Sequence, residues 1–311
     1  MAADGAGLTS VVIVAADSGP LLADSVAAAL ASDARVEVIV VDNASNDGEP
    51  ERVASLHRED ARVRLLENER NLGFGPACNR GAALANGDAL LFVNPDCVIE
   101  RDTIASLRAI AAGDATIGVI GIEVLSPDGT PARGNRRRDP TLRRALMSMS
   151  GLSRFESRSR AFEGVEMPAD SASGVGVEKL EAVSGACLFL PRRVFDTVSG
   201  FDEAYFLHVE DLDLCRRVRN AGYAVAFARG VHAMHVQGTS SRRRPLFVAW
   251  HKHRGMWRWF TRFDPAARVW PVRAIVALGL WVHFALTAPL LLARQLSANS
   301  GRTKKETPRA T

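Results

Sequence analysis

The stretch Val36-Glu37-Val38-Ile39-Val40-Val41-Asp42-Asn43-Ala44-Ser45 decides the fold class. Its first six residues are mostly apolar and β-branched, which predicts a strand buried on both faces of a sheet. Asp42 and Asn43 then stand at the carboxyl end of that strand, followed by turn-forming residues. Ligands of open α/β sheets bind at the carboxyl ends of the strands, so polar residues placed there are candidates for a binding site.

The same pattern continues on both sides of this stretch. Short apolar runs predict further strands at Val11–Ala15, Val63–Leu66, Ala89–Val93 and Ile117–Ile122. Helical patterns lie between them, at Leu21–Ala31, Glu51–Arg58, Pro76–Ala85 and Thr103–Ala112. This alternation predicts the α/β class, with an open, mostly parallel central sheet and flanking helices.

The second half of the chain is less regular. Leu125–Val177 is rich in Gly, Ser, Pro and Arg, and we expect a long excursion over the face that carries the site. Regular patterns return at Ala182–Leu190, in a helix at Glu210–Ala221, and in strands at Ala224–Ala228 and Val231–His235. We expect a main α/β domain over residues 1–241, a membrane-association region over 242–296 and a disordered basic tail over 297–311.

Charge is distributed unevenly along the 311 residues. The chain has 39 Lys and Arg against 35 Asp and Glu, a net charge of +4, and its ordinary composition excludes disordered, collagen-like and disulfide-scaffold classes. Residues 242–311 hold 14 Lys and Arg but only 2 Asp and Glu, so the body is net acidic. This division predicts a soluble body with an attachment region that prefers an anionic surface.

The four cysteines form neither a metal cage nor a disulfide framework. Cys78, Cys97, Cys187 and Cys215 are scattered, and no pair has C-x-x-C spacing. We therefore expect the body to reside in a reducing cytoplasm.

Three polar segments follow predicted strands. Asp42 can accept hydrogen bonds from a ribose or a base edge, although Asx-turn chemistry explains it as well. Gly73 and Gly75 precede a helix, where the backbone can approach a diphosphate, but they also fit a plain glycine-rich connection. Asp96, in Asn94-Pro95-Asp96, can hold a divalent cation or simply form a turn.

Acidic and histidine residues of the second half add further candidates. Glu210 and Asp211 start a predicted helix, where carboxylates suit the dipole, and such a pair is also a candidate general base. Asp213 and Arg217 have the spacing of an ordinary ion pair on a helix surface. Strand alternation puts His232 and His235 on opposite faces, so we do not expect them to share one metal.

The motifs, taken in order, resemble family 2 inverting glycosyltransferases of the GT-A fold, in the bacterial rhamnosyltransferase-like branch. The resemblance covers roughly Thr9–Ser240. The motifs that carry it are Asp42-Asn43-Ala44-Ser45, Asn71-Leu72-Gly73-Phe74-Gly75, Asn94-Pro95-Asp96, Gly200-Phe201-Asp202-Glu203, Glu210-Asp211-Leu212-Asp213-Leu214 and His235.

The resemblance implies a role for each matching position. Asp211 is implied as the general base, with Glu210 as the nearby alternative, and Asp96 with His235 as ligands of Mg²⁺ or Mn²⁺. Asn94 stands where the family's D-x-D has its first Asp, which predicts weaker or altered metal binding. Asp202 and Glu203 are expected on the acceptor side. The remaining implied residues, expected to bind the nucleotide sugar, are Asp17, Asp42, Asn43, Asn71, Gly73, Asn79 and Asn94.

The implied activity is transfer of a sugar, such as rhamnose from dTDP-rhamnose, to a saccharide or polyprenyl-linked acceptor in cell-surface polysaccharide synthesis. The alternatives are a nucleotidyltransferase on a similar sheet and a non-catalytic, membrane-docked nucleotide-sugar binder. The basic segment Arg133–Arg144 is expected either to guide a lipid diphosphate or to be a solvated arginine-rich loop.

The basic end of the chain predicts a membrane contact. All five tryptophans lie within residues 250–281, interleaved with arginines, and Ala274–Ala293 runs 20 residues without a charge. At about 1.5 Å per residue such a helix could cross roughly 30 Å of hydrocarbon. We favour an anchor lying in the plane of the cytoplasmic membrane face, over a single span and over a helix buried in a soluble homodimer. The uncharged run and the acidic body argue against nucleic acid as a partner.

Overall fold

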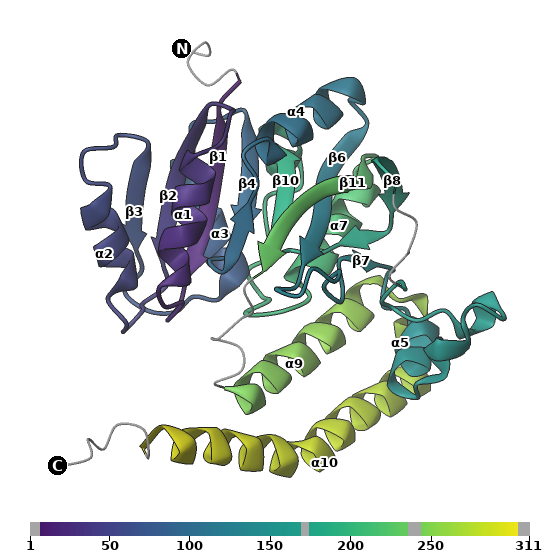
Figure 1. Ribbon diagram of the computed structural model, residues 1–311. Helices are drawn as coiled ribbons and strands as arrows, with labels where there is room; N and C mark the ends of the chain where they lie inside the picture. Colours follow the sequence, from purple (N-terminus) through teal and green to yellow (C-terminus); the bar gives the residue numbers. More distant parts are fainter. Residues whose placement is uncertain (1–6, 169–173, 236–243, 304–311) are drawn as a thin grey trace.

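The computed structural model describes residues 7–168, 174–235 and 244–303, with side chains described as far as residue 293. A twisted sheet forms the centre, helices cover both of its faces, and two long helices lie along one edge of the body (Figure 1). The α/β class and the mostly parallel arrangement of the first strands are as predicted.

The main sheet has the strand order β3-β2-β1-β4-β10-β6-β11-β5, with β8 also paired to β11. Strands β1 to β4 are mutually parallel where they pair, whereas β10 runs antiparallel to both of its neighbours. A two-stranded sheet, β7-β9, lies beside it. The bounds are β1 Thr9–Ala15, β2 Val36–Asp42, β3 Val63–Glu67, β4 Ala89–Val93, β5 Cys97–Ile99, β6 Ile117–Leu125, β7 Arg136–Arg137, β8 Gly176–Leu180, β9 Ala182–Val183, β10 Cys187–Pro191 and β11 Ala224–His235.

The helices divide between the two faces of the sheet because successive side chains of a strand point to opposite sides. Val11 and Ile13 pack in the core that α1 and α4 cover, whereas Val12 and Val14 pack in the core that α3, α6, α7 and α9 cover. The bounds are α1 Leu21–Leu30, α2 Glu49–Leu56, α3 Phe74–Leu84, α4 Thr103–Gly113, α5 Leu142–Met149, α6 Arg192–Thr197, α7 Glu210–Asn220, α9 Pro245–Phe263 and α10 Trp270–Thr303, with short 3₁₀ turns at Leu152–Phe155, Arg160–Phe162 and Pro265–Arg268.

Two predicted elements differ from the structure. The pattern at Ala182–Leu190 is not continuous, because the turn Ser184–Ala186 separates β9 from β10. The two strands predicted at Ala224–Ala228 and Val231–His235 are one strand, β11, with a register irregularity between Ala228 and His232. A bulge of this kind bends a strand, and it lets β11 pair with β8 along one part and with β5 along the other.

Helix α9, which the sequence places in a separate membrane region, packs into the body. Trp259 is 1% exposed and belongs to the core on the α3 and α7 face, and Phe263 of the same helix packs against that core. Arg262 reaches Asp213 at 3.1 Å. Asp213 is 0% exposed, so the expectation of a helix-surface ion pair with Arg217 is wrong: the pair exists, but it lies in the core beneath α9.

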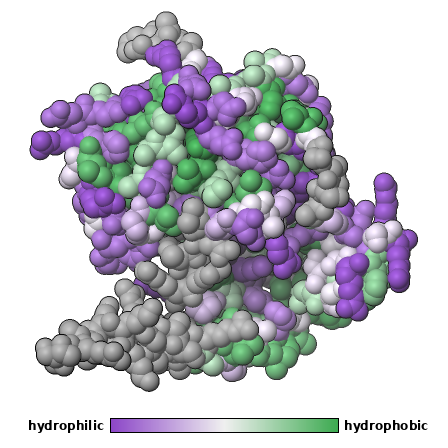
Figure 2. Space-filling model, in the orientation of Figure 1, coloured by the Kyte–Doolittle hydropathy of each residue, from purple (hydrophilic) through white to green (hydrophobic). Residues whose placement is uncertain are grey.

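Helix α10 packs along α9, where Trp250 contacts Trp281 and Phe284. Its segment Trp270–Ala293 is long and apolar enough to cross a membrane, with a mean hydropathy of 2.1, and none of it is buried. Hydrophobic residues gather on this lower part of the molecule (Figure 2). The helix continues to Thr303, so residues 297–303 are helical where disorder was expected, and 304–311 lie outside the described residues.

The different surroundings of two tryptophans give a direct test of α9 docking. Trp259→Ala removes a buried ring and is expected to lower the free energy of unfolding by about 3–5 kcal/mol. Trp270→Ala is the matched control, because Trp270 is 78% exposed, and it is expected to change stability by less than about 0.5 kcal/mol. Urea denaturation in a mild detergent measures both, and equal losses would contradict the docking of α9.

Candidate active site

A candidate metal corner forms where β4 ends and β11 ends. Antiparallel pairing of β5 with β11 sets His235 opposite Cys97, directly after Asp96. The His235 Nε2 atom lies 3.0 Å from the Asp96 Oδ1 atom, and the Cys97 sulfur lies within 4.8 Å of both groups. Two residues that are 139 positions apart, and that the resemblance implies as metal ligands, are therefore neighbours in space.

The donor set of this corner fits a divalent cation such as Mg²⁺ or Mn²⁺. A carboxylate suits both ions, and an imidazole adds a nitrogen ligand that Mn²⁺ accepts. Burial raises the pKa of the Cys97 thiol well above its ordinary value. Its sulfur is a soft donor, whereas Mg²⁺ and Mn²⁺ prefer oxygen ligands. Two protein ligands leave most coordination positions for the oxygens of a bound diphosphate.

The second histidine of β11 points elsewhere. The His232 Nε2 atom lies 3.0 Å from the Glu123 Oε2 atom, on a neighbouring strand. As strand alternation predicts, His232 and His235 have different partners and do not meet at one site.

A buried pair of carboxylates stands at the start of α7. Glu210 is 6% exposed and Asp211 is 9% exposed. Asp211 forms an ion pair with Arg137, accepts a hydrogen bond from the Gly185 N–H at 2.9 Å, and accepts another from the Leu212 N–H at 2.8 Å. A carboxylate has about four acceptor positions, so one position of Asp211 remains available to a ligand hydroxyl.

The environment drives the two carboxyl groups to opposite charge states. Burial acts to raise the pKa of Asp211, but the Arg137 guanidinium and the backbone donors outweigh it and hold this pKa below its ordinary value. Burial, and then the charge of Asp211, raise the pKa of Glu210 to about 8. The Glu210 Oε2 atom has no hydrogen-bond partner among the described residues. At neutral pH one carboxyl is ionised and the other is protonated, a division typical of catalytic pairs.

The loop before this pair is strained. His208 and Val209 both have positive φ, at 65° and 75°, and a β-branched residue rarely adopts this conformation. Helix α9 packs directly on the loop: a Cβ atom added to Gly255 would lie 3.0 Å from the Val209 Cγ2 atom and 3.1 Å from the His208 carbonyl oxygen. Gly255 therefore permits the close packing that holds the strained loop, and through it the carboxylate pair, in place.

One turn joins the metal corner to the carboxylate pair. In the turn Ser184–Ala186, the Ala186 carbonyl accepts from the Asn94 N–H at 2.9 Å, and the Gly185 N–H donates to Asp211. A Cβ atom at Gly185 would lie 3.0 Å from the Asp211 Cβ atom, so only glycine allows this approach without a shift. Asp211 and Asn94, which lies two residues before Asp96, therefore both bond to the same short turn.

Two of the residues that the resemblance implies in nucleotide binding, Asp17 and Asp42, lie at the carboxyl ends of β1 and β2. Asp17 accepts from the Asn46 N–H at 2.7 Å, and Asp42 accepts from the Ser45 N–H at 2.9 Å. The turn chemistry weighed as the alternative for Asp42 is thus present. For both residues, contact with a nucleotide stays a prediction.

The side chain of Asn43 binds the loop that follows β3. Its amide group donates to Asn71 at 2.9 Å and to the Gly73 carbonyl at 3.1 Å, and its oxygen accepts from the side chain of Asn68 and from the Leu72 N–H. Its hydrogen-bonding capacity is fully used, so Asn43 shapes the loop that follows β3. At Gly73, φ is 93° and the Phe206 backbone is so close that no side chain fits.

Asn79, Asp202 and Glu203 form a separate group. Asn79 donates to the Phe201 carbonyl at 2.9 Å and to Glu203 at 3.1 Å, and it accepts from the Phe201 N–H at 2.8 Å. Asp202 is paired with Arg258 and Arg262 of α9. These contacts fasten the Gly200–Phe201 turn and α9 to the body; the donor and acceptor roles expected of these three residues stay predictions.

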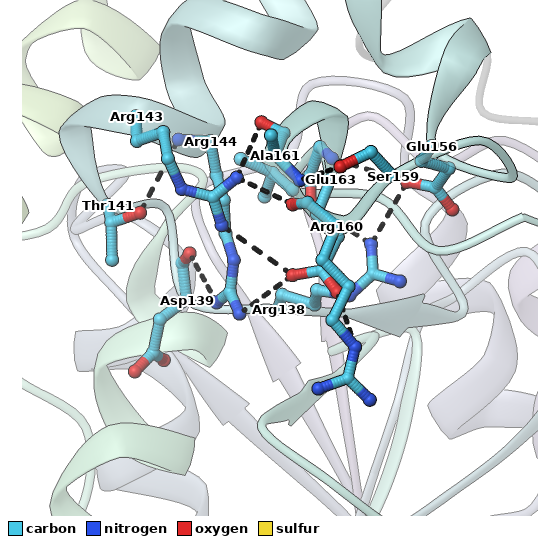
Figure 3. Close-up of polar contacts among 12 residues, drawn as sticks. Arg138, Asp139, Thr141, Arg143, Arg144, Glu156, Ser159, Arg160, Ala161 and Glu163 are labelled. Atoms are coloured by element: carbon cyan, nitrogen blue, oxygen red, sulfur yellow. Dashed lines mark hydrogen bonds and ion pairs between the residues drawn. The ribbon is translucent and has the colours of Figure 1, made fainter.

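The arginines of this segment form internal ion pairs, and the segment is not uniformly solvated, because the Arg133 side chain is 90% exposed but those of Arg138 and Arg144 are largely buried. Figure 3 shows Arg138 directed to Glu156 and Arg143 and Arg144 to the segment 160–163. Arg144 also pairs with Glu181, and Arg137 with Asp211. Most of these charges are thereby neutralised within the molecule.

Sequence reasoning assigned no role to Arg137, Gly185 or Gly255. Arg137 lies within the basic segment and Gly185 within the regular pattern at Ala182–Leu190, but no spacing rule connects either of them to Asp211. The strain at Val209 has no sequence signal, because a β-branched residue rarely adopts positive φ.

The two histidines of β11 provide a matched test of the metal corner. His235→Gln is expected to weaken Mn²⁺ binding at least about tenfold, because it removes one of two protein ligands. His232→Gln, on the same strand, is expected to bind Mn²⁺ like the unaltered protein. Electron paramagnetic resonance of free Mn²⁺, with a nucleoside diphosphate present, measures both, and an equal effect of the two substitutions would refute the assignment.

Comparisons with known proteins show the family of this chain. Residues 10–177 match the family model described as "Glycosyl transferase family 2". The chain is 30% identical to the N-acetylglucosaminyl-diphospho-decaprenol L-rhamnosyltransferase of Mycobacterium tuberculosis (strain CDC 1551 / Oshkosh), over 86% of this chain and 90% of that protein.

Two solved structures share the fold. A mannosyltransferase from Pyrobaculum calidifontis, solved with GDP-Man and Mn²⁺, superposes with a TM-score of 0.55 at 18% identity and covers 96% of this chain and 76% of its own. GalNAc-T7, solved with UDP, GalNAc and Mn²⁺, gives a TM-score of 0.58 at 18% identity over 75% of this chain, which spans only 44% of that protein. These likenesses confirm the GT-A architecture, and with the family match they show that the chain belongs to glycosyl transferase family 2.

Proposed function

We propose that this chain is an inverting, metal-dependent rhamnosyltransferase that works at the cytoplasmic face of a membrane. It would transfer rhamnose from a nucleotide diphosphate donor, such as dTDP-rhamnose, to a saccharide carried on a polyprenyl diphosphate. The observation that carries the proposal is the ionised, buried Asp211, which shares the turn Ser184–Ala186 with the corner formed by Asp96 and His235. The name of the mycobacterial relative supports the choice of sugar and acceptor.

Asp211 would act as the general base. Its free acceptor position takes the hydrogen of the acceptor hydroxyl, whose oxygen bonds to the anomeric carbon of the sugar. The bond from that carbon to the diphosphate oxygen breaks at the same time, and the nucleoside diphosphate leaves with the electron pair. A single displacement inverts the anomeric configuration, and it needs no covalent intermediate. Arg137 keeps Asp211 ionised and oriented for this step.

Asp96 and His235 would hold the metal ion, which when bound neutralises charge on the leaving diphosphate. The Mn²⁺ in both solved relatives supports this assignment. On the donor side, Asp17 and Asp42 would contact the nucleoside, while Asn71, Gly73 and Asn94 shape the adjoining loops. Glu210 would be protonated at neutral pH, so it would add no second negative charge beside the base.

We infer the membrane location from α10 together with the basic end of the chain. The exposed apolar segment Trp270–Ala293 would lie in the membrane or cross it, with the basic residues on both sides of it near anionic lipid headgroups. A homodimer remains a further prediction.

The family match removes the support for a nucleotidyltransferase, which would release inorganic diphosphate. The remaining alternative is a binder without turnover. Purified protein with dTDP-rhamnose, a polyprenyl-diphosphate-linked N-acetylglucosamine acceptor and Mn²⁺ is expected to release dTDP and to form a rhamnosylated lipid of inverted configuration. Donor binding without dTDP release from any saccharide acceptor would overturn the proposal in favour of a binder.

Two adjacent substitutions test the assignment of the base. Asp211→Asn is expected to lower kcat by about 10²–10⁴-fold, with donor binding retained as evidence of folding. Glu210→Gln is expected to keep most activity at pH 7, because Glu210 is protonated there. In the unaltered enzyme the rate should fall as pH rises through about 8, where Glu210 gains a charge beside Asp211, and Glu210→Gln should abolish this fall. If Glu210→Gln loses as much activity as Asp211→Asn at pH 7, Glu210 is the base.

A further inference from the structure

A cavity of about 530 Å³ adjoins the carboxylate pair on the side of α10. Its wall is built from four parts of the chain that converge there: the start of α7, α9, the middle of α10, and the segment around α5 (Figure 1). Glu210 and Asp211 line it, but none of Asp17, Asp42, Asp96 and His235 does. The cavity therefore reaches the proposed base from outside the donor and metal sites.

One part of the lining is polar and carries positive charge. It includes Lys252 of α9 together with Arg137 and Arg133. Arg137 is committed to Asp211, and Arg133 pairs with Glu166 at 3.0 Å, another lining residue. Lys252 has no ion-pair partner among residues 7–168, 174–235 and 244–293, so its charge is left for a ligand.

The positive charge of Lys252 affects the pKa values of two histidines that line the cavity. Burial, and then the positive charge of Lys252, lower the pKa of the lining residue His208 to about 4. The same charge also acts to lower the pKa of His253, which lines the cavity as well. With both imidazoles neutral, Lys252 is the cation that an anionic ligand would meet on this side of the cavity.

The other part of the lining is apolar and reaches the candidate membrane helix. Ala145, Met149 and Val165 come from the segment around α5, Met256 comes from α9, and Leu280 comes from α10. Leu280 lies within the exposed apolar segment Trp270–Ala293. A hydrocarbon chain held here would therefore continue along a surface that is suited to the membrane.

We propose that this cavity binds the diphosphate and the first isoprene units of the lipid-linked acceptor, with Lys252 contacting the diphosphate and Met256 and Leu280 contacting the prenyl chain. The proposal rests on the proposed function and adds to it the place of the lipid carrier. A cation and an apolar wall side by side match a ligand that is anionic at one end and hydrocarbon at the other. The saccharide would then lie between the diphosphate and Asp211.

Direct binding tests this site without turnover. The probe is farnesyl diphosphate in a non-ionic detergent with EDTA, because chelation removes the metal on which diphosphate binding at Asp96 and His235 depends. Lys252→Gln is expected to weaken farnesyl diphosphate binding about tenfold, the loss of one charge-assisted contact. Arg254→Gln is the matched control, because Arg254 is an exposed cation two residues further along α9 that does not line the cavity. Equal effects of the two substitutions, or none, would overturn the proposal.

A second pair of substitutions tests the apolar wall. Leu280→Gln is expected to weaken farnesyl diphosphate but to leave inorganic diphosphate unaffected. Leu278→Gln, at an exposed residue of the same helix that does not line the cavity, is expected to change neither. If Leu278→Gln has the same effect as Leu280→Gln, the prenyl chain is held by the micelle or membrane and not by the cavity.

Kinetics separate the failure of this proposal from the failure of the proposed function. If the enzyme turns over, Lys252→Gln should raise KM for the lipid-linked acceptor about tenfold and leave KM for the nucleotide sugar unchanged. Normal turnover with an unchanged acceptor KM would overturn the cavity assignment alone. Absence of turnover in the unaltered protein would refute the proposed function, while the binding experiments would still decide whether the cavity takes a prenyl diphosphate.

Discussion

The ion pair between Arg137 and Asp211 is the interaction on which the site depends. Two consecutive carboxyl groups are buried at the start of α7, and burial of a charge is costly unless a partner compensates it. Arg137 supplies that partner from β7, a two-residue strand that pairs with β9. The long segment between β6 and β8 therefore completes the site: it brings in the cation that keeps Asp211 ionised, while Glu210 beside it stays protonated.

The same pair connects parts of the chain that are remote in sequence. The Gly185 N–H donates a hydrogen bond to Asp211. Helix α9 packs closely against the strained loop before Glu210, at Gly255. Helix α9 is itself fastened to the body by Arg262 and by the buried Trp259. Helix α10 follows α9 after a short 3₁₀ turn, and it lines the cavity beside Glu210 and Asp211. The apolar helix α10 is thus connected through α9 to the loop before Glu210.

Much of this architecture is readable from the sequence, because buried parallel strands are continuous apolar runs and the polar residues that follow them fall at one edge of the sheet. The pairing of Asp96 with His235 also agrees with the motifs that suggested it. What could not be predicted depends on long-range packing. Arg137 looked like one cation in a basic loop, Asp213 like a surface residue, and Trp259 like a membrane contact, because sequence does not show that α9 folds back over α7. The strain at Val209 is likewise imposed by packing and has no local signal.

The central claim is that burial keeps Glu210 protonated, while Arg137 keeps the neighbouring Asp211 ionised. Carbon-13 NMR of protein labelled at the glutamate carboxyl carbons, titrated from pH 4 to 10, tests it most directly, with Glu210→Gln used to assign the resonance. We expect the Glu210 signal to titrate near pH 8 in the unaltered protein. A Glu210 signal that titrates near 4.5, the ordinary value for glutamate, would contradict the account.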